Sequence, residues 1–182
     1  MYKIGIIGKL CSGKTTVAKS IKFNLNKLDF KICSFGLKVK EIACELFNMD
    51  MNNKNRLIMQ SVGTKMREID ENVWVNYIIN SNKDKNIIVD DVRYLNEFSE
   101  LKKNNTIFIK LELSKEEQLK RLKKYYPDNW EKHYENTNHQ SETEHEKINN
   151  IDIHIKINVD KLTETEVCKE VLDKLIKFIY IV

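Results

Sequence analysis

The segment GKLCSGKTT, at residues 8–16, constrains the fold of this chain more than any other part of the sequence. Gly8 and Gly13 are five positions apart, and Lys14 and Thr15 follow the second glycine. The apolar run YKIGII before the segment predicts a strand, and the residues after it predict a helix. A strand, a glycine-containing turn and a helix with this spacing are typical of a loop that wraps a polyphosphate, because glycine lets backbone amides approach the phosphates closely.

Each position of this loop has an expected role in binding ATP. Lys14 is expected to reach the β- and γ-phosphates, and Thr15 to coordinate Mg²⁺. Cys11 is expected to be a tolerated small residue of the loop with no redox role. The whole loop is expected to contact ATP: Gly8, Lys9, Leu10, Cys11, Ser12, Gly13, Lys14, Thr15 and Thr16.

The composition is that of one intracellular globular domain, residues 1–182. The chain has 182 residues, of which 41% are hydrophobic, enough for one sizeable core. Its four cysteines have neither CxxC nor metal-ligand spacing, which favours a reducing compartment such as the cytoplasm. No apolar run approaches the roughly 18 residues of a membrane span. A net charge of +4 does not require a nucleic-acid partner.

Short apolar runs alternate with amphipathic stretches along the chain. The runs predict strands at residues 2–8, 31–35, 86–90, 106–111 and 152–157. The stretches predict helices at residues 13–28, 37–47, 54–69, 73–79, 94–103, 114–125 and 163–179, with a break near Gly63. This alternation predicts an α/β protein of the P-loop NTPase class, a five-stranded parallel sheet with helices on both faces. Ligands are then expected beyond the carboxyl ends of the strands.

The strand predicted at 86–90 ends in two carboxylates, within the sequence NIIVDDVRYLNE. Asp90 and Asp91 would point to opposite faces of a regular strand, so only one is expected to face the phosphate loop. We favour Asp91 as the Mg²⁺ ligand beside Thr15. Arg93, two residues further on, is expected to contact a transferred or acceptor phosphate.

Residues 37–80 are predicted to form a helical insert that binds the phosphate acceptor. Arg56 and Gln60 are four residues apart and share a helix face, and their side chains suit a monophosphate and a base edge. Arg67, beyond the predicted break, suits bidentate contact with a phosphate. Trp74 is expected either to stack on a base or to lie in the core.

Residues 114–147 are predicted to form a lid over the phosphates. The first helix of this segment carries five lysine or arginine residues and two glutamates, and Arg121 is our candidate for a catalytic cation. Six acidic residues and two lysines follow Pro127. We expect the acidic stretch to hold the basic helix in register when no ATP is bound. The six-residue spacing of His133, His139 and His145 suits no metal site.

The segments GKLCSGKT, LIMQSVGTKMRE, VDDVRYLNE and HQSE together resemble the deoxynucleoside monophosphate kinases of bacteriophages and large DNA viruses. The resemblance spans about residues 1–160, and only its phosphate loop is strongly specific. It implies ATP- and Mg²⁺-dependent phosphorylation of a deoxynucleoside monophosphate, in the host cytoplasm if the chain is viral. It also implies substrate contacts for His139 and Glu142. Many members have aspartate where Thr15 follows Lys14, which leaves the role of the second threonine, Thr16, open.

The residues themselves favour a phosphate acceptor over an alcohol, since the sequence offers many cations and no obvious general base. A kinase of another phosphorylated metabolite, such as a phosphomevalonate kinase, is the alternative enzyme. A non-catalytic, switch-like nucleotide-binding protein is the alternative of a different class. The sequence leaves the accepted bases, the selection of deoxyribose over ribose and the formation of a homodimer undecided.

Overall fold

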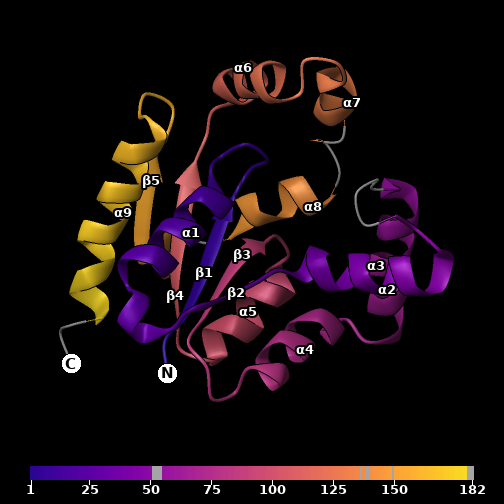
Figure 1. Ribbon diagram of the computed structural model, residues 1–182, viewed down its shortest axis with the longest axis horizontal. Coiled ribbons are helices and arrows are strands. Elements are labelled where there is room, and N and C mark those ends of the chain that lie inside the picture. The colour runs from indigo at the N-terminus through magenta and orange to yellow at the C-terminus, as the bar shows by residue number, and fades with distance from the viewer. Residues whose placement is uncertain (51–54, 136, 138–139, 149, 180–182) are drawn as a thin grey trace.

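Five parallel strands form the centre of the protein, in the order β2-β3-β1-β4-β5 (Figure 1). The computed structural model describes residues 1–50, 55–135, 137, 140–148 and 150–179. The strands are β1 (Lys3–Gly8), β2 (Lys31–Cys33), β3 (Ile87–Val92), β4 (Thr106–Glu112) and β5 (Ile155–Asn158). The α/β class and the parallel five-stranded sheet predicted from the sequence are thereby confirmed.

Helices cover both faces of this sheet, so the central strands are apolar on both sides. The helices α1 (Lys14–Asn24) and α9 (Glu164–Ile179) pack over one face, in a core that includes Ile4, Ile6 and Ile109. The helices α2 (Phe35–Phe47), α4 (Val73–Ser81) and α5 (Leu95–Lys103) pack over the other, around Ile7 and Phe108. No helix among the described residues has both the length and the apolar character that a membrane span requires.

The remaining elements lie near the carboxyl ends of the strands or connect the layers (Figure 1). The helix α3 (Arg56–Ile69) packs against α2. The segment predicted to be a lid contains α6 (Lys115–Tyr125), α7 (Trp130–Glu135), α8 (Gln140–Thr143) and the 3-10 turn η3 (Glu144–Lys147). Two further 3-10 turns are η1 (Asn26–Leu28) and η4 (Asn150–Asp152).

The predicted break near Gly63 is wrong. The helix α3 continues through Gly63 and ends at Ile69, and α4 begins at Val73. A glycine inside a helix costs only about 1 kcal/mol relative to alanine. Here a Cβ at Gly63 would lie 4.0 Å from Val39, so the residue sits where α2 packs closely against α3.

Gly5 gives a test of this packing. A Cβ at Gly5 would lie 2.9 Å from two ring carbons of Phe108, whose side chain is fully buried and has no room to move away. We expect Gly5→Ala to lower the free energy of unfolding by about 1–3 kcal/mol. Gly63→Ala is the matched control, because its Cβ would make only ordinary contacts. That variant should be neutral or more stable by up to about 1 kcal/mol. Urea unfolding checks both, and a neutral Gly5→Ala would contradict the packing.

Candidate functional site

The loop between β1 and α1 has the backbone that a phosphate-binding loop needs. Gly13 has φ 94° and ψ 14°, a left-handed conformation that glycine adopts without strain. Gly8 is needed for a different reason, since a Cβ there would lie 2.6 Å from Ser12 Oγ and 2.8 Å from the Leu111 carbonyl oxygen. α1 then begins at Lys14, so its free amides and the positive end of its dipole lie at the loop.

Lys14 is buried under this loop. Its ammonium donates hydrogen bonds to the carbonyl oxygens of Gly8, at 2.7 Å, and Lys9, at 2.8 Å. Burial, together with the nearby positive charge of Arg93, lowers the pKa of Lys14 to about 7. An anion in the loop would favour the charged form of Lys14, so this ammonium is suited to a ligand that brings negative charge.

Asp90 and Asp91 make different contacts at the end of β3, and our choice of Asp91 as the Mg²⁺ ligand needs correction. Thr15 Oγ1 donates a 2.9 Å hydrogen bond to Asp90, not to Asp91. Both oxygens of Asp91 accept hydrogen bonds from the start of α2. The donors are Ser34 Oγ at 2.7 Å, Phe35 N at 2.9 Å and Gly36 N at 2.9 Å. Thr15 and Asp90 therefore form the oxygen pair suited to Mg²⁺, which takes one or two protein ligands plus phosphates and water.

An irregular register explains why strand alternation misled us. β1 pairs Gly5 with Val89 but Ile7 with Val92, so two residues of β3 stand opposite the single residue Ile6. Such a bulge re-aims side chains that strict alternation would send to opposite faces. Both carboxylates consequently line the same cavity.

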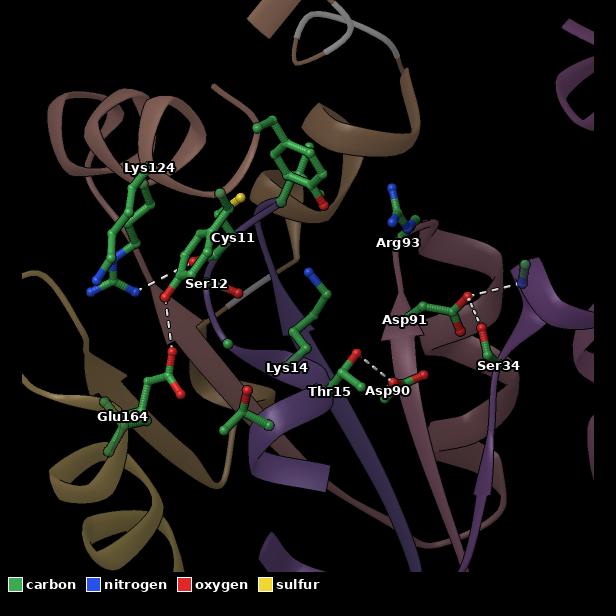
Figure 2. A pocket seen from close by; sticks show the side chains of 18 of the residues that line it. Cys11, Ser12, Lys14, Thr15, Ser34, Asp90, Asp91, Arg93, Lys124 and Glu164 are labelled. Carbon is green, nitrogen blue, oxygen red and sulfur yellow. Dashed lines mark hydrogen bonds between the residues drawn. The ribbon is translucent and has the colours of Figure 1, made fainter. Parts of the chain in front are cut away.

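This cavity has a volume of about 1090 Å³ and extends to both sides of the phosphate loop. Figure 2 shows Lys14 between Asp90, Asp91 and Arg93 on one side and Lys124 and Glu164 on the other. We call the first side the acceptor end; it is lined by Ser34, Gly36, Leu37, Lys40, Met59, Asp90, Asp91 and Arg93. We call the second side the donor end; it is lined by Glu117, Lys120, Arg121, Lys124, Tyr125, Tyr126, Leu162, Thr163, Glu164 and Val167.

Arg121 lines the donor end of the cavity. Its guanidinium donates to Glu117 Oε1 at 3.1 Å, to the Cys11 carbonyl at 3.4 Å and to the Val159 carbonyl at 2.5 Å. Gln118 of the same helix donates a 3.1 Å hydrogen bond to the Leu10 carbonyl. α6 is thus bonded directly to the phosphate loop. Closure of this segment as a lid stays a prediction.

The acidic stretch after Pro127 contacts different partners from those we expected. Glu142 forms an ion pair with Arg93, and its other oxygen accepts a 3.2 Å hydrogen bond from Leu10 N. Glu146 pairs with Lys9 at 3.1 Å. These carboxylates bind the phosphate loop and the loop after β3, whereas α6 packs its Lys123 over the Trp130 ring at 4.6 Å. For Glu142 and Glu146, the expectation that the acidic stretch holds the basic helix in register is therefore wrong.

The residues predicted to bind the acceptor lie in three kinds of place. Trp74 is in the core, 3% exposed, and donates to the Gly63 carbonyl at 3.2 Å, so it has no face open to a base. The cavity lining includes neither Arg67 nor the half-buried Gln60. Arg56 begins α3, but its side chain is outside the described part of the structure, as is His139.

Sequence reasoning missed two features of the site. The first is the amide pair at the start of α2, Phe35 and Gly36, for which the Ser-Phe-Gly sequence carries no motif signal. The second is a 2.8 Å hydrogen bond from Tyr125 Oη to Glu164, which joins α6 to α9 at the donor end. Only the fold brings these residues together.

Comparison with known proteins agrees with this geometry. Residues 4–145 match a family described as AAA domain (AAA_18). No curated protein matches the sequence. Solved structures with the same fold include shikimate kinase from Aquifex aeolicus vf5, which has 19% identity, a TM-score of 0.57 and 98% coverage of both chains. A gluconokinase from Sinorhizobium meliloti 1021 has 12% identity and a TM-score of 0.58, with 97% of this chain and 93% of that chain covered.

Shikimate kinase from Acinetobacter baumannii, solved in complex with shikimate, is similar to the same degree. It has 17% identity and a TM-score of 0.58, and the alignment covers 100% of this chain and 96% of that one. At these identities the similarity establishes the fold. The chain therefore has the fold of P-loop kinases.

The lowered pKa of Lys14 predicts how ATP affinity depends on pH. Below pH 7 the ammonium is already charged, while above pH 7 binding must take up a proton. Affinity should therefore fall by up to about tenfold per pH unit above 7. Calorimetry at pH 8 in two buffers of different ionisation enthalpy should detect the proton uptake. Lys14→Arg should abolish it, because guanidinium stays charged. Wild-type binding without proton uptake at pH 8 would contradict the assignment.

Because Asp90 and Asp91 make different contacts, replacing each with alanine should cause a different defect. Asp91→Ala removes the acceptor of three donors, so the free energy of unfolding should fall by about 1–3 kcal/mol. Asp90→Ala should instead raise the Mg²⁺ concentration needed for half-maximal ATP binding, by roughly tenfold or more. Urea unfolding and Mg²⁺ titration of ATP binding separate the two. An increased Mg²⁺ requirement in Asp91→Ala alone would reverse our assignment.

Proposed function

The chain belongs to the AAA domain family that its residues 4–145 match, and from this premise we propose that it is an ATP- and Mg²⁺-dependent kinase of deoxynucleoside monophosphates. The observation that carries the proposal is the two-ended cavity. A phosphate loop lies at its middle, and the cations Lys40 and Arg93 line the acceptor end. The resemblance of four sequence segments to viral and bacteriophage deoxynucleoside monophosphate kinases supports the acceptor class.

The chemistry of the acceptor end favours a phosphate over a hydroxyl group. Neither carboxylate on this side is well placed to remove a proton from an alcohol: Asp91 has both oxygens bonded to the start of α2, and Asp90 is bonded to Thr15 and assigned with it to Mg²⁺. A monophosphate is already ionised near neutral pH and requires positioning and charge neutralisation more than a base. Lys40 and Arg93 bring positive charge to this end.

The residues around the loop have complementary roles in this reaction. Backbone amides of the loop and Lys14 bind the phosphates of ATP, and Thr15 with Asp90 would hold Mg²⁺. Arg93 on one side and Arg121 on the other stabilise the charge that spreads over the transferred group. When bound, Mg²⁺ would supply further charge neutralisation. Catalysis then consists of holding two phosphates in line and stabilising the transition state.

The activity is tested by ADP release with a panel of acceptors. The panel holds the common ribo- and deoxynucleoside monophosphates, together with shikimate, gluconate and phosphomevalonate. We expect turnover with one or more deoxynucleoside monophosphates and none with the hydroxylated acids. Lys14→Ala should lower turnover by roughly 10² or more, because a preorganised charge is lost.

Lys19→Ala is the matched control for this variant. Lys19 is an exposed residue of the same helix and does not line the cavity, so its removal should leave turnover unchanged. Turnover with shikimate, gluconate or phosphomevalonate alone would overturn the acceptor assignment. ATP binding without turnover on any acceptor would identify a non-catalytic nucleotide-binding protein.

A further inference from the structure

A buried carboxylate behind the acceptor end joins two elements of the site. Glu97 is the third residue of α5 and only 1% exposed. Its Oε2 accepts hydrogen bonds from the backbone amides of Arg93, at 2.9 Å, and Tyr94, at 3.1 Å. Its Oε1 accepts a 3.1 Å charge-assisted hydrogen bond from Arg67 of α3. The Glu97 side chain therefore connects α3 to the backbone at Arg93.

Arg67 makes further contacts besides its hydrogen bond to Glu97. Its Nη1 donates to the Gly63 carbonyl at 3.2 Å, and its guanidinium lies 4.1 Å from the centre of the Tyr94 ring. Its Nε is buried and makes no hydrogen bond to the described residues. These contacts direct the guanidinium toward Glu97, and Arg67 does not line the cavity. A guanidinium fixed in this way is poorly placed to bind the acceptor itself.

Burying the Glu97 carboxylate costs more free energy than capping a helix requires. Exposed Ser, Thr, Asp or Asn side chains satisfy the first amides of most helices. Here a glutamate is almost fully buried, and burial raises its pKa to about 7, although two amides and Arg67 favour the charged form. The other ionisable groups that act on it are Asp91, from β3, and Tyr94 at the start of α5. Such a burial is expected where the carboxylate fixes a geometry that a surface cap would leave loose.

We propose that Glu97 is a positioning residue that fixes the backbone of Arg93 for phosphate transfer, and that Arg67 acts through Glu97 instead of contacting the acceptor. This inference rests on the proposed kinase function. Arg93 is one of the cations of the acceptor end and also pairs with Glu142, so its guanidinium depends on the path of residues 92–94. A displacement of about 1 Å in such a group is enough to lower turnover up to roughly 100-fold.

Turnover of Glu97→Gln in two backgrounds tests the inference. In the wild-type background kcat should fall roughly 10- to 100-fold. In an Arg93→Ala background the same change should alter kcat by less than about twofold, because the group that Glu97 positions is absent. The midpoint of thermal unfolding should fall similarly in both backgrounds. Glu100→Gln, the same chemical change on the same helix at a surface pair with Lys103, is the control that keeps kcat.

Arg67→Gln is the second variant, for use if Glu97→Gln fails to fold. It should lower kcat in the wild-type background and not in Arg93→Ala, with the KM of the acceptor changed less than about twofold. A raised acceptor KM at unchanged kcat would mean direct contact with the acceptor, and would overturn the inference. A kcat loss that persists in Arg93→Ala would also overturn it. Absence of turnover in the wild-type protein would refute the proposed function, and the inference with it.

Discussion

Two adjacent carboxylates at the end of β3 hold the cavity together. Asp90 bonds to Thr15 at the start of α1, and Asp91 bonds to three donors at the start of α2. The phosphate loop and the acceptor end are therefore anchored to the same strand, one residue apart. The bulge between β1 and β3 makes this possible, because it lets consecutive residues serve the same edge of the sheet. In the proposed reaction, the spacing between donor and acceptor phosphates would depend on this one short segment.

Buried charge is concentrated around this segment. Burial lowers the pKa of Lys14 to about 7 and raises that of Glu97 to about 7, and it also raises the pKa of Asp90. Shifts of this kind cluster at functional sites, because groups placed for a charged ligand often lack full compensation without it. Folding alone does not require them, since apolar residues of similar volume would pack at least as well. Around this segment, burial therefore disfavours the charged form of a lysine and of two carboxylates.

The sequence was sufficient to predict the loop, the parallel sheet and most of the helices, because each depends on local pattern and spacing. It was insufficient wherever two distant segments decide the outcome. The choice between Asp90 and Asp91 depends on a bulge in pairing with β1, which no local pattern indicates. Arg67 has the chemistry of a phosphate ligand, but its direction is set by Glu97 and Tyr94 of another helix. Trp74 could be assigned to the core only once its neighbours were known.

The central claim is that one cavity holds a donor and an acceptor phosphate at its two ends. Binding of a bisubstrate ligand, adenosine joined to a deoxynucleoside through five phosphates, tests it most directly. Calorimetry with Mg²⁺ should give one site per chain and an affinity at least about 100-fold above that for ATP, since linking two ligands raises the effective concentration of the second. Arg93→Ala should weaken the bisubstrate ligand far more than ATP. An affinity for the bisubstrate ligand no higher than that for ATP would contradict a two-ended site.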